Sequence, residues 1–120
     1  MPIKVLIAED ERNLRRVIVH ELSSEDTVVD EVDDGEKALN LLQHDEYDVL
    51  LLDLNMPVLG GIEVLQKMKH LEIPTEVIIL TGNATIENAV EAMKLGAYDY
   101  LTKPFSFAEL SLVLEKACEK

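Results

Sequence analysis

Five short apolar runs alternate with segments whose apolar residues recur every three or four positions, and this alternation strongly constrains the fold. Short runs rich in Val, Ile and Leu are typical of strands. Apolar residues at spacings of three and four predict amphipathic helices. We expect strands over 3–8, 27–32, 48–52, 76–80 and 97–101. The helical spacing runs through 14–22, 38–42, 62–68, 86–93 and 110–117, and Gly96 is placed to end the fourth helix.

Strict alternation of strands and helices predicts an α/β fold, with a parallel sheet covered by helices on both faces and right-handed crossovers. The runs over 3–8, 48–52 and 76–80 are the most continuously apolar, which indicates central strands. The runs over 27–32 and 97–101 contain charges or tyrosines, which suits edge strands. No linker or repeat interrupts the pattern. We therefore expect residues 1–120 to form one domain, which is long enough to bury its own core.

Composition excludes several classes of protein. Apolar residues make up 48% of the chain, which fits a globular protein, and no apolar run approaches the roughly 18 residues of a membrane span. The N-terminus lacks the basic start of a secretory signal, and the single cysteine, Cys118, favours a reducing cytoplasm. A net charge of −13 argues against direct contact with nucleic acid. The acidity serves either solubility or a cation or basic partner.

Polar residues stand where the three predicted central strands and the fifth strand end. Glu9 and Asp10 follow the first strand, Asp53 follows the third, Thr81 the fourth and Lys103 the fifth. Taken singly, these residues have simpler interpretations as a helix N-cap, a β-branched strand end and a surface lysine. In a parallel sheet, however, ligands bind beyond the carboxyl ends of the strands. Clustered carboxylates repel unless a cation or a proton intervenes, and oxygen ligands of this kind suit Mg²⁺. A lysine and a hydroxyl beside them suit an anion.

Four motifs, in this order and spacing, make the chain resemble a response-regulator receiver domain of two-component signalling over its whole length. They are AEDE (8–11), LLLDLNMPVLGG (50–61), ILTG (79–82) and GAYDYLTKPF (96–105). The resemblance implies a flavodoxin-like three-layer sandwich with a five-stranded sheet of order 2-1-3-4-5 and five helices. Residues 81–105 further resemble receivers joined to sigma-54-dependent AAA+ activators.

The resemblance also implies a role for each site residue. Asp53 matches the aspartate that accepts a phosphoryl group from a histidine kinase or phosphotransfer protein. Mg²⁺ would be held by Glu9, Asp10, Asp53 and the backbone carbonyl of Asn55. The family usually has aspartate where this chain has Glu9, so either a direct or a water-mediated contact with the metal remains open. Thr81 and Lys103 would bind the phosphoryl oxygens, and Thr81 and Tyr100 would form the switch. The resemblance also implies a cis peptide bond between Lys103 and Pro104.

By this resemblance the domain is not an enzyme on other substrates, since it catalyses only its own aspartyl phosphorylation and dephosphorylation. Phosphorylation would change the surface formed by the fourth helix, the fifth strand and the fifth helix. The resemblance implies that this surface controls an output domain or partner, in transcription, or forms a homodimer. We expect it to include Asn88, Glu91, Ala92, Lys94, Asp99, Glu109 and Leu112.

Three other functions are compatible with parts of the pattern. A Mg²⁺-dependent phosphatase of the haloacid-dehalogenase type also uses an aspartyl nucleophile, but it needs a second acid where this chain has Asn55. A flavodoxin-like redox module would need a hydroxyl-rich loop after the first strand, where the sequence reads EDERN. A phosphorylation-independent binding module of receiver type is the third, and phosphate trapping by Asp53 separates it from a true receiver.

Overall fold

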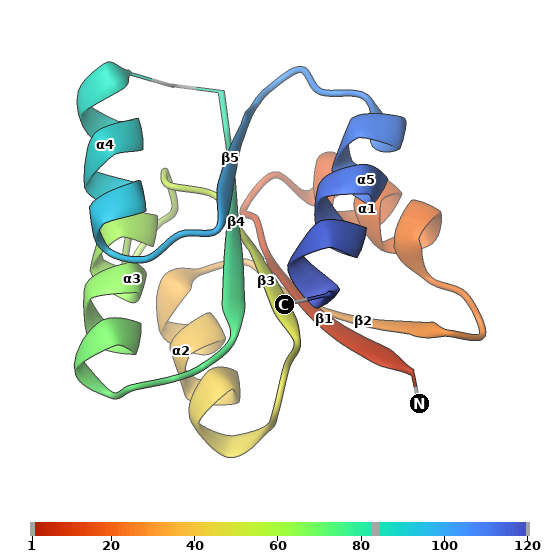
Figure 1. The fold of residues 1–120 in the computed structure, drawn as a ribbon, viewed down its shortest axis with the longest axis horizontal. Coiled ribbons are helices and arrows are strands. Elements are labelled where there is room, and N and C mark those ends of the chain that lie inside the picture. Colours follow the sequence, from red (N-terminus) through yellow and green to blue (C-terminus); the bar gives the residue numbers. More distant parts are fainter. Residues whose placement is uncertain (1, 83–84, 120) are drawn as a thin grey trace.

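Five strands and five helices alternate along the part of the chain that the computed structural model describes, residues 2–82 and 85–119 (Figure 1). The strands are β1 (Ile3–Ala8), β2 (Thr27–Val32), β3 (Val49–Leu52), β4 (Glu76–Thr81) and β5 (Asp99–Thr102). The helices are α1 (Arg12–Leu22), α2 (Gly35–His44), α3 (Gly61–His70), α4 (Ile86–Lys94) and α5 (Phe107–Cys118).

The strands form one parallel sheet in the order β2-β1-β3-β4-β5, which confirms the predicted topology. β1, β3 and β4 are central and almost wholly buried, whereas β2 and β5 are the edges. Central strands of a parallel sheet are covered on both faces, which is why their sequences are continuously apolar rather than alternating. The register sets Ala8 beside Leu52 and Thr81 beside Thr102, so the strand ends meet at one edge of the sheet.

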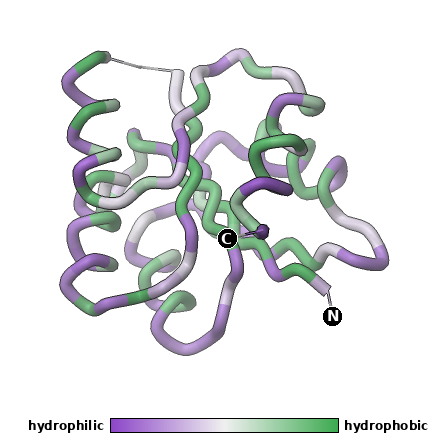
Figure 2. Tube along the Cα trace, in the orientation of Figure 1, coloured by the Kyte–Doolittle hydropathy of each residue, from purple (hydrophilic) through white to green (hydrophobic). Residues whose placement is uncertain are grey.

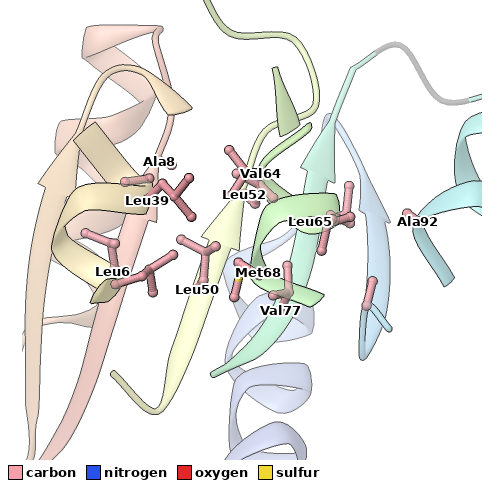
Figure 3. Close-up of a cluster of buried hydrophobic side chains, with 14 of the residues drawn as sticks. Leu6, Ala8, Leu39, Leu50, Leu52, Val64, Leu65, Met68, Val77 and Ala92 are labelled. Atoms are coloured by element: carbon pink, nitrogen blue, oxygen red, sulfur yellow. The ribbon is translucent and has the colours of Figure 1, made fainter. Parts of the chain in front are cut away.

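Two apolar layers flank the sheet. Successive side chains of a strand point to opposite faces, so Leu6 and Leu50 enter one layer while Ile7 and Leu51 enter the other. The first layer lies under α2, α3 and α4, and the second lies under α1 and α5 (Figure 1). Hydrophobic segments accordingly run through the middle of the molecule, and hydrophilic ones lie on the outer turns (Figure 2). Figure 3 shows the first layer, including Leu6, Ala8, Leu39, Leu50, Leu52, Val64, Leu65, Met68, Val77 and Ala92.

The observed helix ends agree with the local chemistry, and one of them, at Gly96, was predicted. Asp34, Thr85 and Ser106 cap α2, α4 and α5, because each side chain accepts a hydrogen bond from a backbone N–H of the first turn. α4 ends at Lys94, and Gly96 follows with φ of +101°, a left-handed conformation that glycine adopts without steric cost. No helix among residues 2–82 and 85–119 is long and apolar enough to cross a membrane.

The sequence prediction was wrong about the buried side of α4. Only Ala92 of that helix is buried, although we expected Ala92 on the outer surface. Conversely, Ile86, Val90 and Met93 follow the apolar rhythm and yet are exposed. The helix packs its small residue against the sheet, so a second set of apolar side chains is left outside. Strand bounds also shift: β3 begins at Val49, β4 reaches Thr81, and β5 covers 99–102 instead of 97–101.

Candidate metal-binding site

Backbone hydrogen bonds bring the polar residues together just beyond the strands. The amide of Asp53 donates to the carbonyl of Ala8 over 3.0 Å, and the amide of Glu9 donates to the carbonyl of Val32 over 3.1 Å. The amide of Lys103 donates to the carbonyl of Thr81 over 2.8 Å. These bonds continue the pairing of the sheet past the strand ends. The functional side chains therefore start from backbone that is as firmly held as the sheet itself.

Three acidic side chains meet at this edge. Glu9, Asp10 and Asp53 each offer a carboxylate oxygen, and these oxygens all lie within 4.8 Å of one another. Glu9 and Asp53 are buried and Asp10 is exposed. Asp10 is not a helix cap, since α1 begins at Arg12 with Glu11 in the N-cap position. Buried oxygen ligands beside one that faces solvent suit Mg²⁺, which keeps several waters when it binds to proteins. The donor set therefore fits this metal.

The ammonium group of Lys103 reaches into the acidic cluster from the end of β5. Its Nζ lies 2.6 Å from Oε1 of Glu9 and 3.3 Å from Oδ2 of Asp53. Burial alone would lower the pKa of Lys103, but its hydrogen bond with Glu9 and the charge of Asp53 outweigh burial and raise that pKa. Lys103 therefore stays cationic, and it offsets part of the repulsion between the carboxylates.

Glu9 is the most deeply buried member of the cluster, with a side chain only 1% exposed. Burial raises the pKa of Glu9 to about 7, although the hydrogen bond from Lys103 lowers it. Its second oxygen accepts a hydrogen bond from the amide of Glu11 over 3.1 Å. We expected Glu9 near the metal, and the structure additionally makes it the closest partner of Lys103. The longer glutamate side chain thus reaches across the cluster toward β5.

Asn55 and Thr81 border the Asp53 carboxylate. The backbone amide of Asn55 donates to Oδ1 of Asp53 over 3.1 Å. The side-chain amide of Asn55 donates through Nδ2 to the hydroxyl of Thr81 over 3.4 Å. Thr81 is fully buried at the end of β4. Asn55 thus connects the end of β3 to the end of β4. The role of its carbonyl as a metal ligand stays a prediction.

Tyr100 lies in β5, one residue before buried Leu101 and partly buried against the first apolar layer. Its hydroxyl is buried and has no hydrogen-bond partner among the described residues. Burial raises the pKa of this phenol. The hydroxyl of this predicted switch residue is therefore under cover in this structure, and its role in a switch stays a prediction. The bond between Lys103 and Pro104 is cis.

Arg15 contacts the site, although the reasoning from the sequence did not include it. Its Nη1 donates to the carbonyl of Glu9 over 2.9 Å, and its Nε donates to Oε1 of Glu31 over 2.8 Å. The reasoning from strand ends finds residues that follow a strand, and Arg15 lies within a helix. A signal was nevertheless present, because Arg15 stands between Leu14 and Ile18, on the side of α1 that packs on the sheet.

The comparisons with known proteins agree with this fold. The model of the family described as Response regulator receiver domain matches residues 5–115, so the chain belongs to the response-regulator receiver domains. It is 37% identical to the regulatory protein AtoC of Escherichia coli over 97% of the chain. It is 40% identical to the transcriptional regulatory protein CutR of Streptomyces coelicolor over 90% of the chain.

A solved receiver domain is also close. The receiver domain of the Francisella response regulator 1452 superposes with a TM-score of 0.91 at 36% identity, over 98% of this chain and 97% of that one. The curated relatives are longer, since the matched region is 25% of AtoC and 50% of CutR. The fold and the family are therefore established for this domain, and its relatives include transcriptional regulators.

Proposed function

We propose that residues 1–120 form one receiver domain that accepts a phosphoryl group from a histidine kinase or phosphotransfer protein onto Asp53. The observation that carries this proposal is the position of the Asp53 carboxylate. It lies within 4.8 Å of two further carboxylates and 3.3 Å from the ammonium of Lys103. A nucleophilic carboxylate that has both a cation site and a fixed ammonium beside it suits the transfer of an anionic phosphoryl group.

In this mechanism an oxygen of Asp53 attacks the phosphorus of a phosphohistidine, the new O–P bond forms, and the N–P bond of the donor breaks. Lys103 turns its ammonium from Glu9 toward a phosphoryl oxygen, and the hydroxyl of Thr81 donates to another. Glu9, Asp10 and Asp53 would hold Mg²⁺, and the bound ion would offset negative charge on the phosphoryl group. The buried strand β3 contributes a rigid position for the nucleophile, and positioning supplies much of the rate of such reactions.

Phosphorylation by a small donor tests the assignment. Incubation with Mg²⁺ and acetyl phosphate should add one acid-stable, base-labile phosphoryl group, detected by intact-protein mass. Asp53→Asn should abolish the addition. Asp45→Asn changes an exposed residue just before β3, at the opposite end of the strands, and should leave the addition of the phosphoryl group intact. Lys103→Ala should uncouple phosphorylation from the downstream response. Normal phosphorylation of Asp53→Asn would show that the acceptor is another residue.

Family membership argues against the phosphatase and the flavodoxin-type redox alternatives. A binding module that ignores phosphorylation would fail the acetyl phosphate experiment while keeping the same fold. We further propose a cytoplasmic location and an output in transcription, which the name of CutR supports for that relative. The link to a sigma-54-dependent AAA+ activator stays a prediction.

The surface of α4, β5 and α5 is our candidate for output or for a homodimer. Ile86, Val90 and Met93 of α4 are exposed, and so is Leu112 of α5. Exposed apolar groups of this kind favour contact with a protein partner, and in a two-fold dimer each patch would meet its own copy. We expect sedimentation velocity to show a larger mass with beryllofluoride, which mimics the phosphoryl group, and no increase for Thr81→Ala. An unchanged mass for the parent protein would exclude dimerisation as the signal of this domain.

A further inference from the structure

The guanidinium of Arg15 joins two elements to the turn that carries the acidic cluster. From α1 it donates Nε to Glu31 of β2 and Nη1 to the carbonyl of Glu9, over 2.8 and 2.9 Å. The Arg15 side chain is 14% exposed and that of Glu31 is 24% exposed, so neither contact is a loose surface pair. Glu31 pairs with Ile7 in the sheet register, which anchors it beside the end of β1.

The carbonyl that Arg15 holds belongs to the peptide bond between Glu9 and Asp10. A peptide unit is planar, so fixing its oxygen fixes the plane from which both residues extend. The side-chain carboxylates of both residues, Glu9 and Asp10, belong to the acidic cluster. Arg15 therefore acts on two proposed metal ligands through one backbone atom. The backbone of this turn is also held by the bond of the Glu9 amide with Val32, by that of the Glu11 amide with the Glu9 carboxylate, and by that of the Arg15 amide with the Glu11 carbonyl.

Arginine is required for this arrangement because its fork presents several donors in fixed directions. One donor is used by the Glu31 carboxylate, and a second is thereby aimed at the Glu9 carbonyl. Arg16 also binds Glu31, through Oε2, but its side chain is 61% exposed and contacts Glu31 from the outside. Two arginines hold Glu31 ionised: burial would raise its pKa, and the contacts with Arg15 and Arg16 lower it overall.

We propose that Arg15, braced by Glu31, is a positioning residue that sets the geometry of the Glu9–Asp10 turn and thereby the affinity of the site for Mg²⁺. The inference rests on the proposed function, because it assigns Glu9 and Asp10 as ligands. Partners that orient metal ligands typically change metal affinity by about 10- to 100-fold when they are lost.

The test uses Arg15→Lys and, as its matched control, Arg16→Lys. Lysine keeps the charge in both variants, but one ammonium cannot reproduce the two directed bonds of Arg15. Without metal, hydrogen exchange of the amides of residues 9–11, followed by NMR, should be faster in Arg15→Lys and unchanged in Arg16→Lys. Amides of β4, away from the turn, should exchange alike in both variants, which shows that the fold is intact.

With Mg²⁺ alone as the ligand, we expect the dissociation constant of Arg15→Lys to be roughly 10-fold weaker and that of Arg16→Lys to match the parent protein. Phosphorylation by acetyl phosphate should be slow for Arg15→Lys at low Mg²⁺ and recover at saturating Mg²⁺, because only the ligand geometry has changed. A purely structural loss would lower the rate at every Mg²⁺ concentration.

Equal Mg²⁺ affinity and equal exchange in the two variants would overturn the inference while leaving the proposed function standing. If the parent protein bound no Mg²⁺, the proposed function and the role of Arg15 in metal affinity would both fall. Faster exchange at residues 9–11 would then still show that Arg15 orders the turn. The two failures are therefore distinguishable.

Discussion

Tyr100 shows how a single buried atom bears on stability. Its hydroxyl is covered and has no hydrogen-bond partner among the described residues, and leaving such a group unsatisfied costs about 1–3 kcal/mol. Tyr100→Phe should therefore raise the free energy of unfolding, by about 1 kcal/mol in urea denaturation. Tyr47→Phe is the matched control, because the Tyr47 hydroxyl donates to Asp30 over 2.6 Å. That variant should lose stability, and a loss in both would show that Tyr100 has a partner.

The raised pKa of Glu9 predicts the direction in which the free energy of unfolding changes with pH when no Mg²⁺ is present. Its pKa is about 7 in the folded protein against an ordinary 4.5, so the native state binds the proton more tightly. The resulting stabilisation is complete at low pH and is lost as the pH rises through about 7. The free energy of unfolding should thus fall between about pH 5 and 7, by up to roughly 1 kcal/mol per pH unit.

Glu9→Gln should flatten that dependence, because its side chain does not titrate. Glu21→Gln, at an exposed position of α1, should keep it. Chemical denaturation at several pH values, in the presence of a chelator, gives the comparison. A dependence that survives in Glu9→Gln would assign it to other groups.

At the scale of single residues, the sequence was sufficient to locate most of the site. Asp53, Thr81 and Lys103 follow directly from the rule that parallel strands end at one edge. The bond from Arg15 to Glu9 could not be predicted in this way, because it depends on how far a side chain reaches from a neighbouring helix. For the same reason, the sequence analysis assigned Lys103 to a phosphoryl group and did not predict its ion pair with Glu9.

The contact between the start of α3 and the residues that follow β3 is the element-scale feature that most directly affects the site. α3 begins at Gly61, and a Cβ there would lie 2.6 Å from the carbonyl oxygen of Asp53 and 2.7 Å from Cα of Leu54. Both are backbone atoms, which cannot move aside as a flexible side chain does. Glycine therefore allows the helix to begin directly against the residue that we propose as the phosphoacceptor.

Gly61→Ala should lower the free energy of unfolding by about 1–3 kcal/mol, the usual cost of overpacking. It should also slow phosphorylation by acetyl phosphate, because the displaced backbone carries Asp53. The neighbouring Gly60→Ala is the control, since its nearest contact would be the carbonyl oxygen of Leu54 at 3.4 Å. Thermal melts and phosphorylation rates of the two variants provide the test. Equal behaviour would mean that the helix start adapts to a methyl group.

The elements themselves were largely predictable, because each carries its own periodic pattern. α4 is the exception, since its apolar spacing is that of a buried face while the structure buries Ala92 and exposes Val90. A periodicity shows that a helix has an apolar side but not what covers that side. For α4 we propose that another protein surface covers this side, and no local pattern can distinguish such a partner from the core.

For the whole molecule, the net charge of −13 means that stability should respond to cations in two ways. Any salt screens the general repulsion, whereas a site-bound ion stabilises the native state according to its affinity. At a Mg²⁺ concentration about ten times the dissociation constant, the gain is roughly 1.4 kcal/mol, which raises the melting temperature by a few degrees. NaCl at equal ionic strength should give less.

Asp10→Ala should remove most of the Mg²⁺-specific increase, and Glu9→Ala should remove less if Glu9 acts through water. Glu21→Ala removes one exposed carboxylate of α1 and should preserve the increase. Differential scanning calorimetry with and without Mg²⁺ measures these effects. A melting temperature that responds equally to Mg²⁺ and to NaCl in the parent protein would show that the acids are not a metal site.

The bond between Lys103 and Glu9 spans 94 positions of the sequence, and the one between Lys103 and Asp53 spans 50. Contacts this distant form late, because closing a long loop costs entropy before any contact compensates for it. During biosynthesis, the ribosome must therefore release β5 before a growing chain can assemble the pocket. In a chain that is still emerging, or in one with β5 undocked, phosphorylation would not be coupled to a response. Competence for signalling would thus report that the last strand of the sheet has been added.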